Sequence, residues 1–145
     1  PMAPAELPKS IKDGKDVVVS HFPNDGLAVV AMSEALSQLF AQERLASVAI
    51  ICENEENALS FYHALKNSTD VRLVVDGEFS FKPGIDITDV AQIKGLEFDY
   101  VIIPDANVAS YPDTPVARRA LHIAVTRAVH QLWVLAIGRP SEILG

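Results

Sequence analysis

The sequence predicts an α/β fold with a mostly parallel sheet and helices on both of its faces. Short apolar runs alternate with segments of helical apolar spacing along most of the chain. The run Ser47–Cys52 is continuously apolar, as in a strand that is buried on both faces. The length of 145 residues suits a single domain with a full hydrophobic core.

Two strand-and-helix pairs are expected in the first half of the chain. The opening segment Pro1–Lys15 contains three prolines and is expected to be a linker or boundary segment. A strand around Val17–Val19 precedes Asn24, whose side chain can cap a helix. The strand Ser47–Cys52 is followed in the same way by a helix that begins after Asn54 and has acidic residues in its first turn.

The second half is expected to add shorter strands and one further helix. A loop rich in turn residues, Asp76–Gly84, separates two of these strands. The expected strands are Val71–Val75, Asp86–Ala91, Tyr100–Ile103 and Leu132–Ile137, and the expected helix is Val116–Val129. Parallel pairing follows from this order, because parallel strands need long crossover connections such as helices.

The composition is that of a globular chain. Hydrophobic residues make up 49% and charged residues 21% of the sequence. The net charge is −7, whereas nucleic-acid binders usually carry a basic face, so we expect this chain to bind nucleic acid weakly by itself. No apolar run approaches the roughly 20 residues of a membrane-spanning helix. The single cysteine, Cys52, excludes an internal disulfide and fits a cytoplasmic protein.

The first segment that could carry chemistry is Lys94–Asp99, KGLEFD, which joins two apolar runs. Gly95 allows the backbone to turn sharply or to approach a ligand closely. The nearby carboxylate of Glu97 can accept hydrogen bonds from sugar hydroxyls. Taken alone, these residues favour a plain loop, because one glycine beside charged residues is common.

The second such segment is Arg118–Ala128, RRALHIAVTRA, in which Arg127 lies late in the expected helix. A guanidinium group binds phosphate in a bidentate manner. An arginine that reaches a γ-phosphate from a neighbouring domain can accelerate hydrolysis by orders of magnitude. Taken alone, however, Arg127 fits a helix-end cation that complements the helix dipole.

Other candidate side chains are assigned to structural roles. Tyr100–Asp105 is similar to a strand that ends in a magnesium-binding aspartate, but no phosphate loop accompanies it, so we expect a loop aspartate at Asp105. Cys52 is expected to be a buried small hydrophobe and Trp133 a core residue. The four histidines are too scattered for a metal site, and we predict no metal ligand in this chain.

Together, the two chemical segments resemble a known family. KGLEFDYVII is similar to motif V of UvrD/Rep-type superfamily 1 helicases, and IAVTRAVHQLWVL is similar to their motif VI. The motifs stand in the family order, about 30 residues apart, and the pair Arg118-Arg119 precedes the second motif as it does in the family. The clear resemblance covers about Ile87–Ala136, and a weaker one reaches back to about Val17.

The resemblance implies a RecA-like domain over residues 16–145, the second of the two in such helicases. The ATP site would lie in the cleft between the two domains, and hydrolysis there would drive movement along nucleic acid. No GxxxxGKS/T phosphate loop occurs in this sequence, so Mg²⁺ would be held mainly by the first domain. We therefore predict negligible ATPase activity for this chain alone.

The resemblance also implies roles for individual residues at the matching positions. Glu97 would contact the ribose of ATP, and Gly95 would let the backbone approach the nucleotide. Arg127 would be the arginine finger on the γ-phosphate, and Thr126 would order the segment around it. Lys94 would lie beside the nucleotide and the nucleic-acid interface.

Four positions depart from the family pattern. Family members often have Thr-x-His shortly before KGLEF, where this sequence has Asp89 and Ala91. Glu53 stands where the family has an arginine, and His122 stands where a tyrosine is common. These departures weaken the expectation of direct contact with nucleic acid and of duplex unwinding.

Three functions therefore stay open. The first is a DNA helicase or translocase that acts on single-stranded DNA or another nucleic acid. The second is a HelD-like ATPase that remodels RNA polymerase, because the run IIPDANVASYPDT is compact and the segment Leu65–Ile85 is too short for the inserted subdomain of UvrD and Rep. The third is a binding module of the same fold without catalysis, which the acidic charge and the missing phosphate loop would suit.

Overall fold

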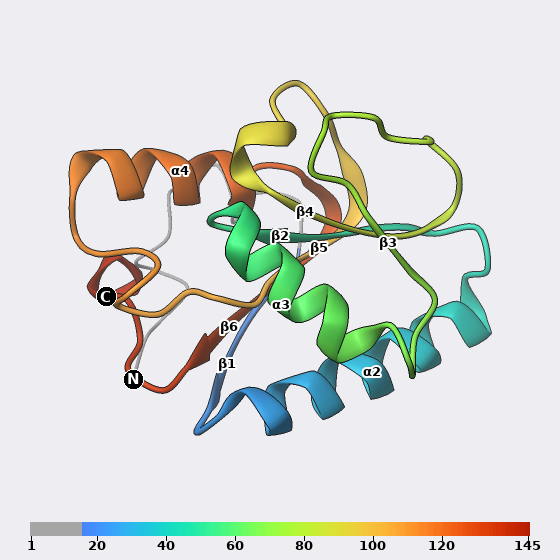
Figure 1. The fold of residues 1–145 in the computed structure, drawn as a ribbon, viewed down its shortest axis with the longest axis horizontal. Coiled ribbons are helices and arrows are strands. Elements are labelled where there is room, and N and C mark those ends of the chain that lie inside the picture. Colours follow the sequence, from blue (N-terminus) through green and yellow to red (C-terminus); the bar gives the residue numbers. More distant parts are fainter. Residues whose placement is uncertain (1–15) are drawn as a thin grey trace.

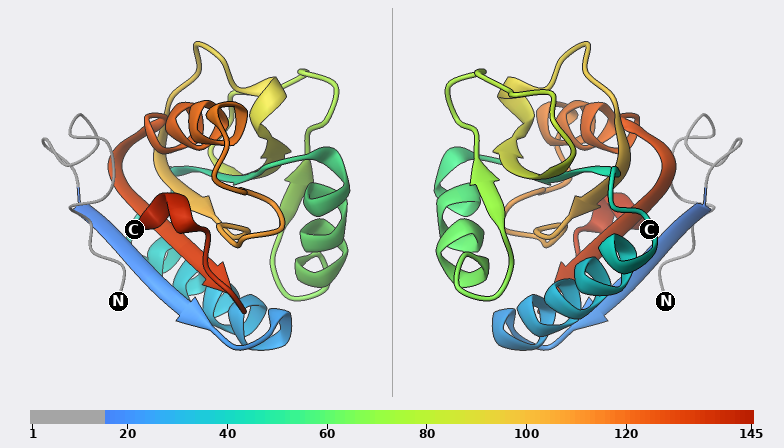
Figure 2. Two further views of the ribbon diagram at one scale, coloured as in Figure 1. Left: turned by 90° about the vertical axis from the view of Figure 1, so that its left-hand side faces the viewer. Right: turned by 90° about the vertical axis from the view of Figure 1, so that its right-hand side faces the viewer.

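A computed structural model describes residues 16–145 as one six-stranded sheet (Figure 1). The strands are β1 (Asp16–Phe22), β2 (Ser47–Cys52), β3 (Val71–Leu73), β4 (Gly84–Asp89), β5 (Phe98–Ile103) and β6 (Ala128–Ile137). Their spatial order is β1-β6-β5-β2-β4-β3, and every neighbouring pair is parallel. Figure 2 shows β1 at one edge of the sheet, beside β6. The predicted linker Pro1–Lys15 lies outside the described residues.

Helices cover both faces of the sheet, which confirms the predicted fold class. On one face, α2 (Asp25–Gln42) and α3 (Glu55–Leu65) pack over a core cluster that includes β2 and β4. On the other face lie α4 (Pro115–Val125) and the short 3₁₀ helix η2 (Val90–Gln92). A last 3₁₀ helix, η3 (Glu142–Leu144), follows β6. Figure 1 shows α4 and α2 on opposite sides of the strands.

The two predicted asparagine caps are confirmed. The Asn24 side chain accepts a hydrogen bond of 2.9 Å from the backbone N–H of Leu27, and α2 begins one residue after the cap. The Asn54 side chain accepts one of 2.8 Å from the N–H of Asn57 at the start of α3. Each cap satisfies a donor that the first helical turn leaves without a partner.

Strand β2 joins the two halves of the core, as its apolar run predicted. The side chains of Ala49 and Ile51 lie in the cluster under α4, whereas those of Val48, Ile50 and Cys52 lie in the cluster under α2 and α3. All five are almost completely buried. This alternation is what a central strand of a parallel sheet requires, since both of its faces are covered.

The predicted helix Val116–Val129 was wrong at its C-terminal end, because α4 stops at Val125. The Thr126 hydroxyl donates to the carbonyl of Ile123 at 2.9 Å, and the chain then enters β6, where Ala128 pairs with Phe98 of β5. Pairing with a distant strand thus overrides the helical spacing.

The remaining boundaries shift by a few residues from the prediction. Strand β3 is shorter than Val71–Val75, whereas β5 and β6 begin before Tyr100 and Leu132. The strand expected over Asp86–Ala91 starts at Gly84 and gives way to η2 after Asp89.

Candidate nucleotide-binding edge

The KGLEF segment leaves the sheet after β4 and returns to it as β5. The Asp89 side chain caps η2 by accepting a hydrogen bond of 2.9 Å from the N–H of Ala91. Ile93 is fully buried and anchors the turn to the core, and its carbonyl accepts the N–H of Leu96 at 3.1 Å. Between these anchors, Lys94 is exposed.

Gly95 adopts a φ of +79°, in the left-handed region that side chains disfavour. A Cβ atom at this position would meet no atom within 4 Å, so the conformation and not crowding requires glycine. The same open space lets another molecule come close to the backbone of this turn. This geometry is compatible with the predicted approach of a nucleotide.

Arg127 lies in the turn between α4 and β6, and its guanidinium is held by three hydrogen bonds. Nε donates to the carbonyl of Ile123 at 3.2 Å, and Nη1 donates to the carbonyl of Leu96 at 3.4 Å. Nη2 donates to the hydroxyl of Thr126 at 3.1 Å. The Thr126 hydroxyl therefore contacts the Arg127 side chain, and its role toward a nucleotide stays a prediction.

The two predicted motifs meet at one edge of the sheet, where β5 and β6 begin. The N–H of Phe98 donates to the carbonyl of Arg127 at 2.9 Å, in addition to the contact between Arg127 and Leu96. Glu97 is exposed between these two anchored residues. The structure thus brings together all five predicted site residues, which are Lys94, Gly95, Glu97, Thr126 and Arg127. Their roles toward ATP stay predictions.

A pocket beside this edge contains residues that the sequence analysis did not single out. It has a volume of about 150 Å³, and its lining joins Glu97 and Phe98 to Phe79, Phe81 and Lys82 of the β3–β4 loop. This loop was predicted to be irregular, and it is irregular in the structure. The sequence feature that could have indicated these residues is the pair of phenylalanines in an otherwise polar loop.

Asp105 lies at the opposite edge, after β5, where the prediction placed a loop aspartate. Its carboxylate accepts hydrogen bonds from the N–H of Glu53 at 2.7 Å and from the side-chain amide of Asn57 at 2.9 Å. Burial raises the pKa of Asp105 to about 6, against the lowering effect of these hydrogen bonds. Asp105 thus anchors the β2–α3 turn, a role that the sequence did not indicate.

Cys52 is fully buried, as predicted, and burial raises the pKa of its thiol. Trp133 is half-buried against the core, and its Nε1 donates to the hydroxyl of Ser20 at 2.9 Å.

Across residues 16–145, no three His, Cys, Asp or Glu side chains are grouped so that they could hold a metal ion. No helix in that range is long and apolar enough to cross a membrane.

Comparison with known families finds a similarity in the part of the chain that carries both motifs. Residues 84–135 match the sequence profile of the UvrD-like helicase C-terminal domain. The matched segment is therefore similar to that family. It extends from the start of β4 into β6 and includes every predicted site residue. No curated protein matches the chain.

Solved structures share the fold of this chain. The C-terminal domain of a possible DNA helicase from Lactobacillus plantarum WCFS1 is 28% identical, with a TM-score of 0.77, and the match covers 97% of this chain and 84% of that one. The Sulfolobus solfataricus SWI2/SNF2 ATPase core in complex with dsDNA is 14% identical, with a TM-score of 0.58 and coverage of 97% and 32%. S. cerevisiae Dbp5 bound to Gle1 is 12% identical, with a TM-score of 0.60 and coverage of 92% and 37%. The fold is RecA-like, and the chain spans about a third of the latter two proteins.

Proposed function

We propose that this domain completes the ATP site of a DNA helicase or translocase, at a cleft shared with a first RecA-like domain. The observation that carries the proposal is the meeting of the two motifs, in which the guanidinium of Arg127 contacts the carbonyl of Leu96 beside the exposed Glu97. Residues about 30 positions apart in the sequence thereby form one polar edge.

Arg127 is suited to bind a phosphate group at this edge. A guanidinium has five N–H donors, and the three hydrogen bonds of Arg127 leave one donor on each Nη atom. Two such donors match a bidentate contact with phosphate oxygens. Among the described residues, no carboxylate lies within 4.0 Å of the guanidinium, so its charge is not neutralised by an ion pair.

Glu97 and Gly95 fit the sugar side of the same ligand. The exposed carboxylate of Glu97 can accept hydrogen bonds from ribose hydroxyls, and the open turn at Gly95 leaves room for the nucleotide. The described residues contain no cluster of metal ligands, so we assign Mg²⁺ to the first domain. The bound ATP would supply the phosphoryl group, and this chain would supply positive charge and orientation at the γ-phosphate.

Closure of the cleft would bring Arg127 and Glu97 to a nucleotide held by the first domain. Their withdrawal when the cleft opens would convert each hydrolysis event into a relative movement of the two domains. Thr126 would act as a positioning residue, because its hydroxyl accepts a hydrogen bond from Nη2 of Arg127.

The residues at the edge where β2, β4 and β5 end favour a second candidate function, an ATPase of the HelD type that remodels RNA polymerase. Asp89 is almost completely buried and caps η2, so its carboxylate is not free to contact a strand of nucleic acid. Glu53 and Asp105 add acidic groups at the same edge, where a phosphate backbone would be repelled. The connection from α3 to β4 contains only the short strand β3 and a loop.

The experiment that tests the proposal measures ATP hydrolysis by the full-length protein, with and without single-stranded DNA, for the wild type and for Arg127→Ala. We expect the variant to lower kcat by about 10³-fold or more, as for a lost arginine finger. Arg127→Lys is expected to restore little of this activity, because an ammonium group lacks the planar fork. Arg118→Ala is the matched control, since Arg118 lies on α4 and forms an exposed ion pair with Asp113.

The outcomes separate the candidates. Hydrolysis that DNA stimulates and that Arg127→Ala abolishes supports the motor. Hydrolysis that ignores DNA but depends on Arg127, together with far tighter binding to RNA polymerase than to DNA, favours the remodelling ATPase. Wild-type hydrolysis that Arg127→Ala leaves unchanged refutes the arginine finger, and a full-length protein without any hydrolysis is a binding module of the same fold.

A further inference from the structure

The pocket beside Glu97 is walled on its outer side by the β3–β4 loop. Its volume of about 150 Å³ is below the size that holds a whole drug-sized ligand, so it suits one end of a larger molecule. Phe79, Phe81 and Phe98 line the pocket together with Lys82 and Glu97. The lining therefore combines acidic, basic and aromatic residues around one small space.

The three phenylalanines form a row that leads from the core to the surface. Phe98 is buried at the start of β5, and the centroid of its ring lies 6.0 Å from that of Phe79. The Phe79 centroid lies 6.3 Å from that of Phe81, which is 78% exposed. These distances are typical of interacting aromatic pairs, so the exposed ring is supported from below. Because Phe98 follows Glu97 in the chain, the row begins at the predicted ribose contact.

The backbone at Phe81 is held in an unfavourable conformation. Its φ of +58° lies in the left-handed region, and Phe81 is the only residue other than glycine with a positive φ among the described residues. A bulky side chain rarely adopts this region, and such strain clusters at binding sites. An exposed phenylalanine that is kept in this conformation does not stabilise the fold by burial.

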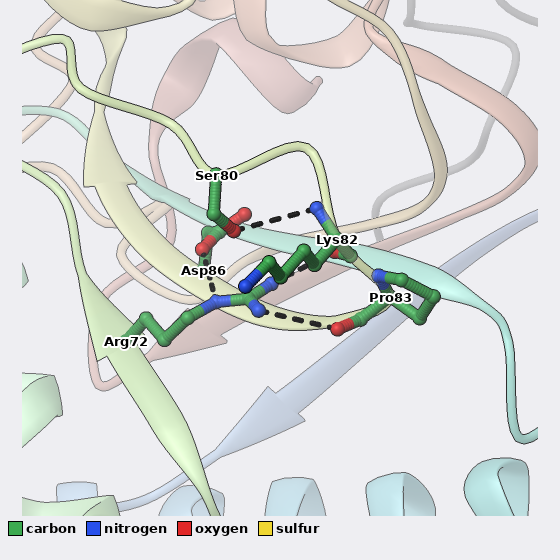
Figure 3. Close-up of polar contacts among 5 residues, drawn as sticks. All are labelled: Arg72, Ser80, Lys82, Pro83 and Asp86. Carbon is green, nitrogen blue, oxygen red and sulfur yellow. Dashed lines mark hydrogen bonds and ion pairs between the residues drawn. The ribbon is translucent and has the colours of Figure 1, made fainter.

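A clamp built on Arg72 fixes the end of the loop beside Phe81 (Figure 3). The Nε of Arg72 pairs with the buried carboxylate of Asp86 at 2.8 Å. Its Nη atoms donate to the carbonyls of Lys82 at 3.0 Å and of Pro83 at 3.2 Å. The Ser80 hydroxyl accepts the N–H of Lys82 at 3.3 Å on the other side of Phe81. The loop is thus organised before any ligand arrives, which reduces the ordering cost of binding.

We propose that Phe81 stacks on the base of the nucleotide whose ribose Glu97 contacts. The inference rests on the proposed ATP site and deepens it, since it assigns the base end of the ligand. Along the edge, Arg127 stands at the phosphate end, Glu97 follows at the ribose, and the aromatic row continues from Phe98 to Phe81. Stacking on one ring accepts any base, because every base has a π face.

The test compares two probes in the full-length protein, which are ATP and ribose 5′-triphosphate, a ligand that lacks the base. We expect Phe81→Leu to raise the Kd for ATP by about 5- to 150-fold, the range of one lost base–aromatic stack. The inhibition constant of ribose 5′-triphosphate should stay unchanged. Phe81→Trp should keep the affinity for ATP, because it keeps an aromatic face. Val116→Ala is the matched control, since Val116 is 71% exposed at the start of α4.

The stacking proposal is overturned if Phe81→Leu binds ATP as tightly as the wild type. It is also overturned if Phe81→Leu lowers the affinity for both probes equally, which would mean that Phe81 contacts the first domain instead of the base. Arg127→Ala is measured beside these variants. Loss of hydrolysis in Arg127→Ala with normal ATP binding in Phe81→Leu removes the stacking proposal alone, whereas unchanged hydrolysis in Arg127→Ala removes the proposed ATP site.

Discussion

At the scale of single residues, Asp105 shows how a loop side chain can hold two elements together. It follows β5, and its carboxylate fixes the turn between β2 and α3 through Glu53 and Asn57. Its second oxygen has no hydrogen-bond partner and is buried, as is the hydroxyl of Tyr111. The negative charge of Asp105 is therefore incompletely compensated in the folded protein, and stability should depend on its protonation.

Asp105→Asn is expected to stabilise the protein at neutral and alkaline pH. Burial raises the pKa of Asp105 from 3.8 to about 6, so the folded protein binds this proton more tightly than the unfolded chain does. The stability that this group contributes is complete below pH 3.8 and is lost as the pH rises through about 6. The pKa difference corresponds to roughly 3 kcal/mol. An asparagine stays neutral and keeps an oxygen that can accept from Glu53 and Asn57.

Urea denaturation at a series of pH values checks this prediction. The variant should exceed the wild type in free energy of unfolding at pH 7.5, and the difference should shrink toward zero near pH 4. Asp113→Asn is the control, because Asp113 is exposed and Arg118 lowers its pKa, so its loss should give no gain at pH 7.5. A gain in Asp105→Asn that does not vary with pH would contradict the titration of Asp105.

The role of a residue could be predicted from the sequence where its partner is a neighbour in the chain, and not where its partner lies in a distant segment. The caps at Asn24 and Asn54 were predictable, because a cap acts on the N–H three residues ahead. The anchoring role of Asp105 was not, since its partner Glu53 lies 52 residues away. The exposure and positive φ of Phe81 were not predicted either, and the residue beside it in the chain, Lys82, is held by Arg72 of β3.

At the scale of elements, strand pairing determines where helices and strands begin and end when the local sequence pattern does not. The spacing of apolar residues continues from α4 into Val129, so the sequence predicted one longer helix. The pairing of Ala128 with Phe98 on β5 decides otherwise and places Arg127 in the turn. That turn brings Arg127 to Leu96, a contact that a longer helix would not provide.

The edge strand β3 has only three residues, and we predict that the Arg72 clamp is what keeps it and the following loop in place. Arg72→Met should lower the free energy of unfolding by about 3 kcal/mol, because it leaves the buried carboxylate of Asp86 without its partner. The double variant Arg72→Met/Asp86→Asn should recover part of this loss. The matched control is Arg118→Met, whose pair with Asp113 is exposed and should cost less than about 1 kcal/mol.

Chemical denaturation of the four proteins measures these differences. Equal losses for Arg72→Met and Arg118→Met would show that the clamp contributes no more than an exposed ion pair. A double variant that is no more stable than Arg72→Met would show that the loss comes from the carbonyl contacts at Lys82 and Pro83, and not from the unpaired Asp86.

At the scale of the whole molecule, the parallel sheet separates two edges of different chemistry. The edge where β5 and β6 begin carries Arg127 and Glu97, and the edge where β2, β4 and β5 end carries Glu53, Asp89 and Asp105. The alternating pattern predicted the parallel sheet but not its strand order, because order depends on which crossovers pack together. The meeting of the two motifs was expected only through the family resemblance.

The last prediction concerns the chain by itself, which should show negligible Mg²⁺-dependent ATP hydrolysis. The sequence contains no phosphate loop, and the described residues contain no cluster of metal ligands. In the proposed function, Arg127 would act on a phosphate group that another domain holds in place, since two donors on one side chain do not fix a triphosphate. With a net charge of −7, the isolated chain should also bind single-stranded DNA much more weakly than the full-length protein does.

Phosphate release by the purified chain, measured beside the full-length protein at equal concentration, checks this expectation. Circular dichroism of the same sample ensures that the isolated chain is folded, which its two core clusters lead us to expect. Robust hydrolysis by the folded chain that Arg127→Ala abolishes would mean that this domain holds the triphosphate without a partner. The shared cleft would then be unnecessary, and the sheet edge at β5 and β6 would have to be a complete site.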